Sequence, residues 1–461
     1  MPQQLINRAM QLHRKQDLVG AISFYQQALD IDPSILQVWT NLGVALRKLK
    51  HYQSSLNCQL RALALAPENA LVLNNLGNIY KDLNLLDESV RCGERACKLE
   101  PKNAGYWFNL AVNLREAQAY ERALVALDKC IWLDPVATPK YEWEKALCYL
   151  YLGRNAEGWA AYRSRLLTGA LPARQFACPE WQGEPLVGKK LWVVTEQGFG
   201  DTIFAARYLE SLAAQSVEIV FECKPPLQRL LSNLSVTLVS PSPDQVVGQG
   251  CDYYAYVMDL PGRFEHMGLP VPAPVGVAAP ALEVQRFKQI IPVNPTGLNI
   301  GIVWSGSETF GDNSRRSPGL KPFLQLAAVP GVRLFSLQKG PGEKELDRHF
   351  ARPFIVDLAP HIQDFADTAA AVSLMDLVVM SDSSVAHLTA SLGKPVWNLL
   401  HSNPYWMYGL KGGSTQWYPA MRFIRQAKAG DWDSVFLSVV QEIEELLASS
   451  SVPGVAGRIS Q

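Results

Sequence analysis

Four short segments decide how the first third of the chain folds: LDIDP (29–33), LALAP (63–67), KLEP (98–101) and WLDP (132–135). The prolines that end these segments follow one another at intervals of 34 residues. Each segment closes an apolar, helix-like stretch, because proline lacks the backbone N–H that a helix needs and disfavours helical backbone in the residue before it. The sequence therefore predicts a repeat of 34 residues in which a helix closes every unit.

The positions inside the units agree with this period. In the first helix of successive units, Leu42 and Gly43 are answered by Leu76 and Gly77, so a large residue stands beside a small one each time. Such alternation lets two helices approach closely, with a notch on one to receive a knob from the other. A 34-residue period with two antiparallel helices per unit is typical of the tetratricopeptide repeat. We expect such an array up to residue 167, ending in a degenerate pair of helices.

Arrays of this kind usually bind peptides or proteins along the surface of their stacked helices. Asn41, Asn75 and Asn109 recur at the same place in the first helices, although Asn is unfavourable in a helix interior. Two interpretations stay open: the three form a ladder that holds a peptide backbone, or they are solvated or cap-forming residues. The array itself predicts a protein or peptide partner.

The composition bounds the size of the protein and excludes some partners. A chain of 461 residues exceeds what one hydrophobic core usually supports, so two or three domains are expected. Lys and Arg total 43, as do Asp and Glu, which argues against a general basic field for nucleic acid or anionic lipid. The first residues lack an apolar signal core, and no stretch approaches the ~20 apolar residues of a membrane span. Eight cysteines without a Cys-x-x-Cys pair complete the prediction of a cytoplasmic protein with reduced thiols.

After residue 167 the chain changes character. A connector rich in Gly and Pro leads into LWVVTEQ (191–197), an apolar run suited to a buried parallel strand. Strand-like and helix-like stretches then alternate, and a second series of the same kind begins at LNIGIVWSG (298–306). It ends with the strand PVWNLL (395–400) and an amphipathic helix over VFLSVVQEIEELL (435–447). This alternation predicts two Rossmann-like lobes, each a parallel sheet covered by helices.

The predicted order is thus an α-helical repeat solenoid followed by an α/β module of two lobes. The repeat domain is expected over residues 1–167 and a linker over 168–188. The first lobe follows over 189–296 and the second over 297–448, and a disordered tail over 449–461 ends the chain. Ligands of open α/β sheets bind beyond the carboxyl ends of the strands, so the residues that carry chemistry are expected in the loops there.

The first loop contains Gln197, Gly198, Gly200 and Asp201, between a predicted strand and a predicted helix. Its glycines permit a tight turn, and the free N–H groups of the helix start favour an anion or an acceptor hydroxyl. The third glycine of the dinucleotide fingerprint is missing, because Ile203 occupies its place, so NAD binding is rejected. Asp201 is either a helix cap or a reacting carboxylate.

The second loop holds Asp382, Ser383 and Ser384 at another predicted helix start, with His387 about one turn into that helix. Hydroxyls and backbone donors in this place suit a phosphate group. A single histidine in such a helix is more often a core residue than a ligand, so both interpretations of His387 stay open.

The third loop follows the strand that ends at Trp304. Ser305 and Gly306 are small, and Arg315 and Arg316 come shortly after them, which could clamp a diphosphate through two guanidinium groups. Lys339 closes the next predicted strand and adds a cation at the same sheet edge. The plain alternative is a solvated basic loop.

Several segments resemble a known group of proteins. They are EQGFGDTIFAARYL (196–209), FECKPPLQRLL (221–231), RRSPGLKPF (315–323), RLFSLQKG (333–340) and SDSSVAHLTASLGKPVW (381–397). In them the chain resembles bacterial tetratricopeptide-repeat proteins with a C-terminal glycosyltransferase-like domain. Those are similar to ADP-heptose lipopolysaccharide heptosyltransferases and more distantly to O-linked N-acetylglucosamine transferases. The resemblance implies a GT-B fold, with the acceptor lobe first and the nucleotide-sugar lobe second.

The resemblance also implies roles for single residues. Gly200-Asp201 matches the heptosyltransferase Gly-Asp in which the aspartate is thought to act as base. Asp382, Ser383, Ser384 and His387 match the nucleotide- and phosphate-binding segment Asp-Thr-Gly-x-x-His. Because Ser384 stands where heptosyltransferases have Gly, heptose specificity is not implied. Arg316 falls near a lysine of their Lys-Arg-Trp-Pro stretch.

The function hypothesis is a glycosyltransferase that needs neither metal nor cofactor. It would move a sugar from a nucleotide-sugar to a protein or glycan acceptor recognised by the repeats. Asp431 and Asp433 form the single Asp-x-Asp after residue 167, but they precede the last helix and are better explained as its cap. The alternative is a non-catalytic scaffold whose transferase-like domain is degenerate.

Overall fold

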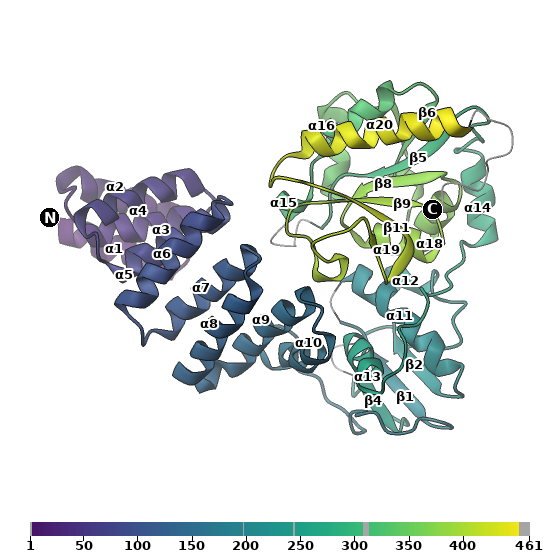
Figure 1. The fold of residues 1–461 in the computed structure, drawn as a ribbon, viewed down its shortest axis with the longest axis horizontal. Helices are drawn as coiled ribbons and strands as arrows, with labels where there is room; N and C mark the ends of the chain where they lie inside the picture. Colours follow the sequence, from purple (N-terminus) through teal and green to yellow (C-terminus); the bar gives the residue numbers. More distant parts are fainter. Residues whose placement is uncertain (1, 197, 243–244, 308–312, 451–461) are drawn as a thin grey trace. The chain divides into compact units, whose positions relative to one another are not determined.

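The computed structural model describes residues 2–196, 198–242, 245–307 and 313–450 (Figure 1). The chain divides into two compact units, Met1–Ala170 and Leu171–Gln461. The first unit is helical and the second is an α/β unit, as the sequence predicts.

The first unit is a series of antiparallel helical hairpins. Its helices are α1 (Pro2–Arg14), α2 (Leu18–Ile31), α3 (Leu36–Lys48), α4 (Tyr52–Leu65), α5 (Ala70–Asp82), α6 (Leu86–Leu99), α7 (Ala104–Glu116), α8 (Tyr120–Leu133), α9 (Thr138–Tyr151) and α10 (Asn155–Tyr162). Short 3-10 helices at Pro135–Ala137 and Arg163–Leu167 complete the unit. The four spaced prolines stand just beyond α2, α4, α6 and α8, so the predicted repeat is confirmed. The degenerate pair corresponds to α9 and α10.

The recurring small residues let the two helices of a unit touch. The buried Ser55 hydroxyl donates to the Gly43 carbonyl at 2.6 Å, and Ser89 does the same to Gly77 at 2.7 Å, in each case across one hairpin. A Cβ added at Gly43 would stand 2.5 Å from the Gln59 amide nitrogen. A side chain at this position would therefore displace the Gln59 amide, which donates to the Thr40 carbonyl at 2.8 Å.

Two recurring tryptophans form a hydrogen bond to the turn that precedes their own repeat unit. The indole N–H of Trp39 donates to the Pro33 carbonyl at 2.7 Å, and that of Trp107 donates to the Pro101 carbonyl at 2.9 Å. The residue in the equivalent place of the intervening unit is Leu73, which packs in the core instead. The period of the sequence thus reflects both a hydrogen bond and close packing.

The second unit begins with a sheet of four parallel strands. These are β1 (Lys190–Val194), β2 (Glu218–Glu222), β3 (Thr237–Val239) and β4 (Tyr253–Tyr256), in the order β3-β2-β1-β4. Helices α11 (Phe199–Ala213), α12 (Pro225–Gln228) and α13 (Leu260–His266) accompany this sheet, whereas α14 (Ala281–Lys288) packs against α18 (Phe365–Ser373) of the second sheet. Because β1 lies between β2 and β4, the carboxyl end of β1 is a topological switch point, where ligands of such sheets bind.

The second sheet has seven strands and is larger than the first (Figure 1). Its strands are β5 (Leu298–Val303), β6 (Val332–Ser336), β7 (Ile355–Asp357), β8 (Leu377–Ser381), β9 (Val396–Leu400), β10 (Ser414–Thr415) and β11 (Tyr418–Arg425), in the order β10-β11-β9-β8-β5-β6-β7. Only the β10–β11 pair is antiparallel among the pairs of the described residues. Since β5 lies between β6 and β8, the switch point is at the ends of β5 and β8.

Short helices and one long one cover this sheet. They are α15 (Asn313–Arg316), α16 (Leu320–Phe323), α17 (Glu345–Arg348), α18 (Phe365–Ser373), α19 (Ser384–Ser391) and α20 (Trp432–Ser450). The apolar face of α20 packs with Val435, Phe436 and Val439 in the core around β5. Between β9 and α20 the structure adds β10 and β11, which the sequence interpretation had not identified. Helix α20 also runs two residues into the segment expected to be a tail, and residues 451–461 lie outside the described part of the chain.

Residues 174–180 of the predicted linker pack on the first sheet. Arg174 forms an ion pair with Glu222 of β2, with Nη2 and Oε1 2.8 Å apart, and the Glu222 side chain is fully buried. Phe176 pairs with Val247 and Glu180 with Tyr254 as isolated β-bridges. This part of the connector therefore belongs structurally to the α/β unit.

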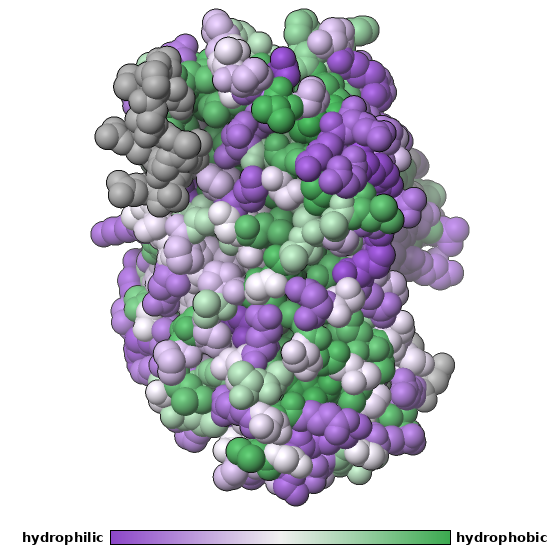
Figure 2. All heavy atoms as spheres, turned by 90° about the vertical axis from the view of Figure 1, so that its right-hand side faces the viewer, coloured by the Kyte–Doolittle hydropathy of each residue, from purple (hydrophilic) through white to green (hydrophobic). Residues whose placement is uncertain are grey.

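A helix that crosses a membrane must be both long and hydrophobic. No helix among the described residues is both long enough and apolar enough to do so. On the face that Figure 2 presents, hydrophilic residues are interspersed with hydrophobic ones along its whole height.

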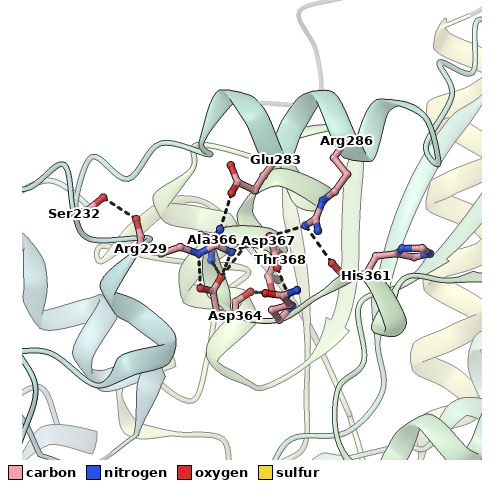
Figure 3. A network of polar contacts seen from close by, with 10 residues as sticks. Arg229, Ser232, Glu283, Arg286, His361, Asp364, Ala366, Asp367 and Thr368 are labelled. Carbon is pink, nitrogen blue, oxygen red and sulfur yellow. Dashed lines mark hydrogen bonds and ion pairs between the residues drawn. The ribbon is translucent and has the colours of Figure 1, made fainter.

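We call the part of the α/β unit around the four-stranded sheet the first lobe and the part around the seven-stranded sheet the second lobe. A network of ion pairs joins the two (Figure 3). Arg229, which follows α12, donates Nε and Nη2 to the Asp364 carboxylate at 2.7 and 2.8 Å, and Nη1 to Glu283 of α14 at 2.6 Å. Asp367 of α18 is 1% exposed and accepts from both Arg229 and Arg286. Burial alone would raise the pKa of Asp364, but hydrogen bonds from Arg229 and from backbone N–H groups hold it below its ordinary value.

The packing of the repeats gives a first prediction. Leu73 of α5 is 0% exposed, whereas Leu71 of the same helix is 48% exposed. Leu73→Ala should lower the free energy of unfolding of the repeat unit by about 3 kcal/mol, because it leaves a cavity in the core. Leu71→Ala should change it by less than about 0.5 kcal/mol. Urea unfolding of the full chain, followed by far-UV circular dichroism, measures both, and equal effects would contradict the described register.

The ion-pair network gives a second prediction. Arg229→Gln should lower the free energy of unfolding of the α/β unit by about 1–2 kcal/mol at neutral pH; the value is modest because the Arg229 side chain is 45% exposed and water screens it. Since the folded pKa of Asp364 is lowered, its contribution is present above the unfolded pKa and is lost as the pH falls through the folded pKa. The difference between wild type and variant should therefore shrink below about pH 3.

The matched control for this prediction is Arg348→Gln, because Arg348 lies on the exposed side of α17. Arg348→Gln should change the free energy of unfolding by less than about 0.5 kcal/mol, both at neutral pH and below about pH 3. Urea titrations at the two pH values measure both variants. An Arg229→Gln effect as small as the control, or one that does not shrink in acid, would contradict the role given to the network.

Candidate functional site

The first candidate carboxylate, Asp201, lies at the switch point of the first sheet. Helix α11 starts after Gly198, and the Asp201 Oδ2 atom accepts the Gly198 N–H at 2.9 Å, so the residue caps the helix. The other oxygen, Oδ1, accepts a hydrogen bond from the Tyr405 hydroxyl at 3.3 Å. Tyr405 belongs to the second lobe. Both carboxylate oxygens of Asp201 are therefore held, one by each lobe.

The environment of Asp201 changes its acidity. Burial raises the pKa of Asp201 above its ordinary value, and the charge of Asp382 acts in the same direction. The hydrogen bonds from Gly198 and Tyr405 and the charge of Lys224 oppose this, but the net shift is upward. A raised pKa is what a carboxylate needs to accept a proton near neutral pH.

The second candidate carboxylate, Asp382, follows β8. Its Oδ1 accepts the Tyr408 hydroxyl at 2.9 Å, and its Oδ2 lies 3.8 Å from Nη1 of Arg316. Ser383 is the N-cap of α19 and accepts the Val385 N–H at 3.4 Å. Ser384 is the first residue of that helix. The three predicted residues thus stand together at a helix start, next to a guanidinium group.

His387 is buried in α19, and both its ring nitrogens contact tyrosine hydroxyls. Nδ1 lies 3.1 Å from the Tyr418 hydroxyl, and Nε2 lies 3.2 Å from that of Tyr408. Burial, together with the charge of Arg207, lowers the pKa of His387 to about 3, so the imidazole is neutral at physiological pH.

The direction of the hydrogen bonds follows from the number of protons. Tyr408 has one hydroxyl proton and gives it to Asp382, so it accepts from His387 Nε2–H. The Nδ1 atom of the neutral ring must then accept from Tyr418. A chain of donors runs from Tyr418 through His387 and Tyr408 to Asp382. This series of hydrogen bonds fixes the orientation of the Asp382 carboxylate from inside the second lobe.

The loop after β5 supplies the third group. A Cβ added at Gly306 would stand 2.5 Å from Nη2 of Arg316, so a larger residue would displace the guanidinium. Asn313 bridges this loop: its amide nitrogen donates to the Ser305 hydroxyl at 3.1 Å, and its oxygen accepts from Nε of Arg316 at 3.3 Å. Ser305, Gly306 and Arg316 are therefore neighbours. The residues 308–312 between them lie outside the described part of the chain.

The two other predicted cations differ from Arg316. Lys339 follows β6, donates to the Ala359 carbonyl at 2.9 Å and lies 3.9 Å from Glu343. Lys339 therefore contacts the segments that follow β6 and β7. Arg315 lies in α15, is partly exposed, and is adjacent to Arg316 in the chain.

The two strand-to-helix loops, predicted separately, meet across the lobes. A Cβ added at Gly200 would stand 2.8 Å from the His387 ring and 3.4 Å from the Ser384 Cα. Glycine is required here because the start of α11 contacts the start of α19, and these helices pack together. Gln197, which was predicted in the same loop, lies outside the described residues.

Sequence reasoning missed the tyrosines of the site. Tyr405 and Tyr408 lie in the segment that follows the carboxyl end of β9, and Tyr418 is the first residue of β11. The aromatic run of residues 405–408 directly after a predicted strand was the available indication. Such a run does not by itself indicate a functional site, because clusters of aromatic residues usually form part of the hydrophobic core.

In the repeat unit, the three predicted asparagines lie within helices and are not at N-caps; Asn69 and Asn103 occupy those positions instead. The Asn109 amide donates to the Asn74 oxygen of the preceding unit at 2.9 Å, and Asn41 hydrogen-bonds Tyr25. The Asn75 amide nitrogen has no hydrogen-bond partner among the described residues. The cap interpretation therefore does not apply to them.

Among residues 2–450, the described parts hold no cluster of three His, Cys, Asp or Glu side chains suited to a metal ion. Asp431, of the Asp-x-Asp pair, accepts the Ser434 N–H at 3.1 Å and so acts at the start of α20.

Known proteins match the repeats and, in one case, more of the chain than the repeats occupy. Residues 36–69 and 70–103 each match the tetratricopeptide repeat model. Protein FlbA of Caulobacter vibrioides is 24% identical over 343 residues, which cover 67% of this chain and 55% of that protein. The chain therefore spans about half the length of this relative.

Solved structures similar to the chain include two of MamA, one of them from Desulfovibrio magneticus. They are 18% and 16% identical, cover 36% of this chain and 91% and 92% of theirs, and have TM-scores of 0.33 and 0.32. YrrB, described as a TPR protein with an unusual peptide-binding site, is 20% identical with a TM-score of 0.31, over 36% of this chain and 84% of its own. The chain is a set of tetratricopeptide-repeat hairpins followed by an α/β region with two parallel sheets.

Proposed function

We propose that the α/β unit is a GT-B glycosyltransferase that moves a sugar from a nucleotide-sugar to a protein or glycan acceptor recognised by the repeats. The observation that supports this most is the contact of Gly200 with His387 and Ser384. It brings the switch points of two parallel sheets together, each with its own carboxylate. A two-lobed site of this kind suits a reaction between two substrates that are held by different lobes.

The second lobe has the chemistry for a nucleotide diphosphate. The start of α19 offers backbone N–H groups, and Arg316 lies beside Gly306, where an anion can approach. Asp382 can accept hydrogen bonds from donor hydroxyls while Arg316, 3.8 Å away, offsets its charge. The chain through His387 holds Asp382 in place.

The first lobe has the chemistry for the acceptor. In the proposed reaction, Asp201 takes the proton of the acceptor hydroxyl, whose oxygen forms a bond to the anomeric carbon of the sugar. The bond from that carbon to the phosphate oxygen breaks, and its electron pair leaves on the diphosphate. Arg316 and the N–H groups of α19 stabilise this charge. The raised pKa of Asp201 suits it to take a proton.

A second candidate is a binding protein without catalysis. The observation that favours it is the engagement of Asp201 on both oxygens, since a helix cap can account for this carboxylate without any reaction. In that case the repeat array would be the functional part, and the α/β unit would bind a nucleotide or serve assembly.

Asp201→Asn tests the proposed base. It keeps the size of the side chain but removes the basic oxygen, so sugar transfer should fall by about 100- to 10,000-fold while nucleotide binding is retained. The control is Asp433→Asn, an equal change at the start of α20, which should leave transfer unchanged. Nucleotide release and glycan mass spectrometry measure turnover. Unchanged turnover in Asp201→Asn would contradict the proposal.

The donor site is tested by a thermal-shift panel of ADP-, UDP-, GDP- and CMP-sugars with the full chain. One nucleotide class should raise the melting temperature of the wild type. Arg316→Ala should weaken its binding about 10- to 100-fold, because a charge-assisted contact is lost. Lys321→Ala, an exposed cation in α16, should not. A panel without any shift would favour the binding-protein alternative.

A further inference from the structure

One short segment of the second lobe contacts both candidate carboxylates. Tyr405 and Tyr408 are three positions apart in residues 401–409, which follow β9. The Tyr405 hydroxyl donates to Asp201 at 3.3 Å, and the Tyr408 hydroxyl donates to Asp382 at 2.9 Å. The two rings lie 6.1 Å apart at an interplanar angle of 75°. The orientation of two carboxylates from two lobes thus depends on the same few residues.

This segment is fixed firmly to the second lobe. Arg425 of β11 donates to the carbonyls of Tyr408, Gly409 and Gly412 at 2.7, 3.0 and 2.8 Å. The Thr415 hydroxyl donates to the Met407 carbonyl at 3.3 Å. Trp406 and Met407 are buried. The position of the Tyr405 backbone is therefore set by the second lobe, whereas Asp201 is set by α11 of the first lobe.

We propose that Tyr405 is a positioning residue for Asp201, fixing the orientation of this carboxylate from the opposite lobe. The inference rests on the proposed function for its consequence in catalysis, but the contact itself can be tested without turnover. Without Tyr405, the carboxylate keeps the hydrogen bond from the Gly198 N–H, which binds only Oδ2. The second hydrogen bond restrains Oδ1 and so the plane of the group.

The contact has a measurable effect on protonation. The groups that face Asp201 are the Gly198 N–H of its own loop, Tyr405, Asp382 and Tyr418 of the second lobe, and Lys224 after β2, with Glu196 acting on Lys224. Burial and Asp382 raise the pKa of Asp201, whereas Gly198, Tyr405 and Lys224 lower it. Removing the Tyr405 hydroxyl removes one lowering influence, so the pKa of Asp201 must rise further.

The test uses the full chain with Tyr405→Phe, which keeps the ring and removes the hydroxyl. The rate at which a water-soluble carbodiimide labels Asp201 is followed against pH by peptide mass spectrometry. The midpoint should lie about 0.5 to 1 pH unit higher in the variant than in the wild type. The control is Tyr253→Phe at the start of β4, on the far edge of the first sheet, which should leave the midpoint in place. An unmoved midpoint in a folded Tyr405→Phe variant overturns the inference.

Turnover gives a second, separate reading. The acid limb of the pH profile for sugar transfer should move upward by the same amount, with kcat lowered and the KM for the donor unchanged. A changed donor KM with an unmoved acid limb would assign Tyr405 to donor binding and overturn the inference. If the wild type transfers no sugar, the proposed function fails, while the labelling midpoint still decides whether Tyr405 holds Asp201.

Discussion

The arrangement of the α/β unit depends on the close approach of two helix starts at Gly200. The first turn of α11 lies against His387 and Ser384 of α19, at a distance that leaves no room for a Cβ. Helix starts concentrate unpaired N–H groups, so two of them side by side attract negative charge. The carboxylates Asp201 and Asp382 lie at these starts, and their mutual repulsion is one reason that the pKa of Asp201 is raised.

Two further sets of contacts hold this approach in place. Arg207 of α11 is buried and donates to the Trp417 carbonyl at 2.8 Å, which ties the first lobe to the segment before β11. The network around Arg229 and Asp364 ties the lobes together at α18. Aromatic contacts also join the two lobes. The ring centroids of Phe204 and Trp417 are 5.2 Å apart, and those of Phe199 and Phe365 are 5.1 Å apart. Charge and packing thus act on both sides of the candidate site.

Features with a local pattern were predictable from the sequence. The repeats were evident because Trp39, Gly43 and Pro33 act within one unit and recur at a fixed period. Strands such as β5 and β8 are mainly apolar and are buried along their whole length. The sequence also indicated the loops of Asp201 and Asp382, since polar residues follow these strands directly. Strand β11 was missed because its burial is irregular and Pro419 interrupts the pattern.

What could not be predicted depends on partners far apart in the chain. The hydrogen bond between Tyr405 and Asp201 joins residues 204 positions apart, and that from Arg207 joins residues 210 apart. No spacing rule connects them. The interpretation of His387 as a phosphate ligand rested on its neighbours in sequence, whereas its ring nitrogens face Tyr408 and Tyr418.

The ion pair of Arg174 with Glu222 determines where the chain can be divided. A fragment that starts at residue 189, at the sheet itself, would lack Arg174 and leave a fully buried carboxylate without its guanidinium. Such a loss is among the costlier changes that a folded protein can suffer. The α/β unit can therefore be excised only upstream of residue 174, close to the division at Ala170. Segments that resemble spacers in composition can supply the counter-ion for a core charge.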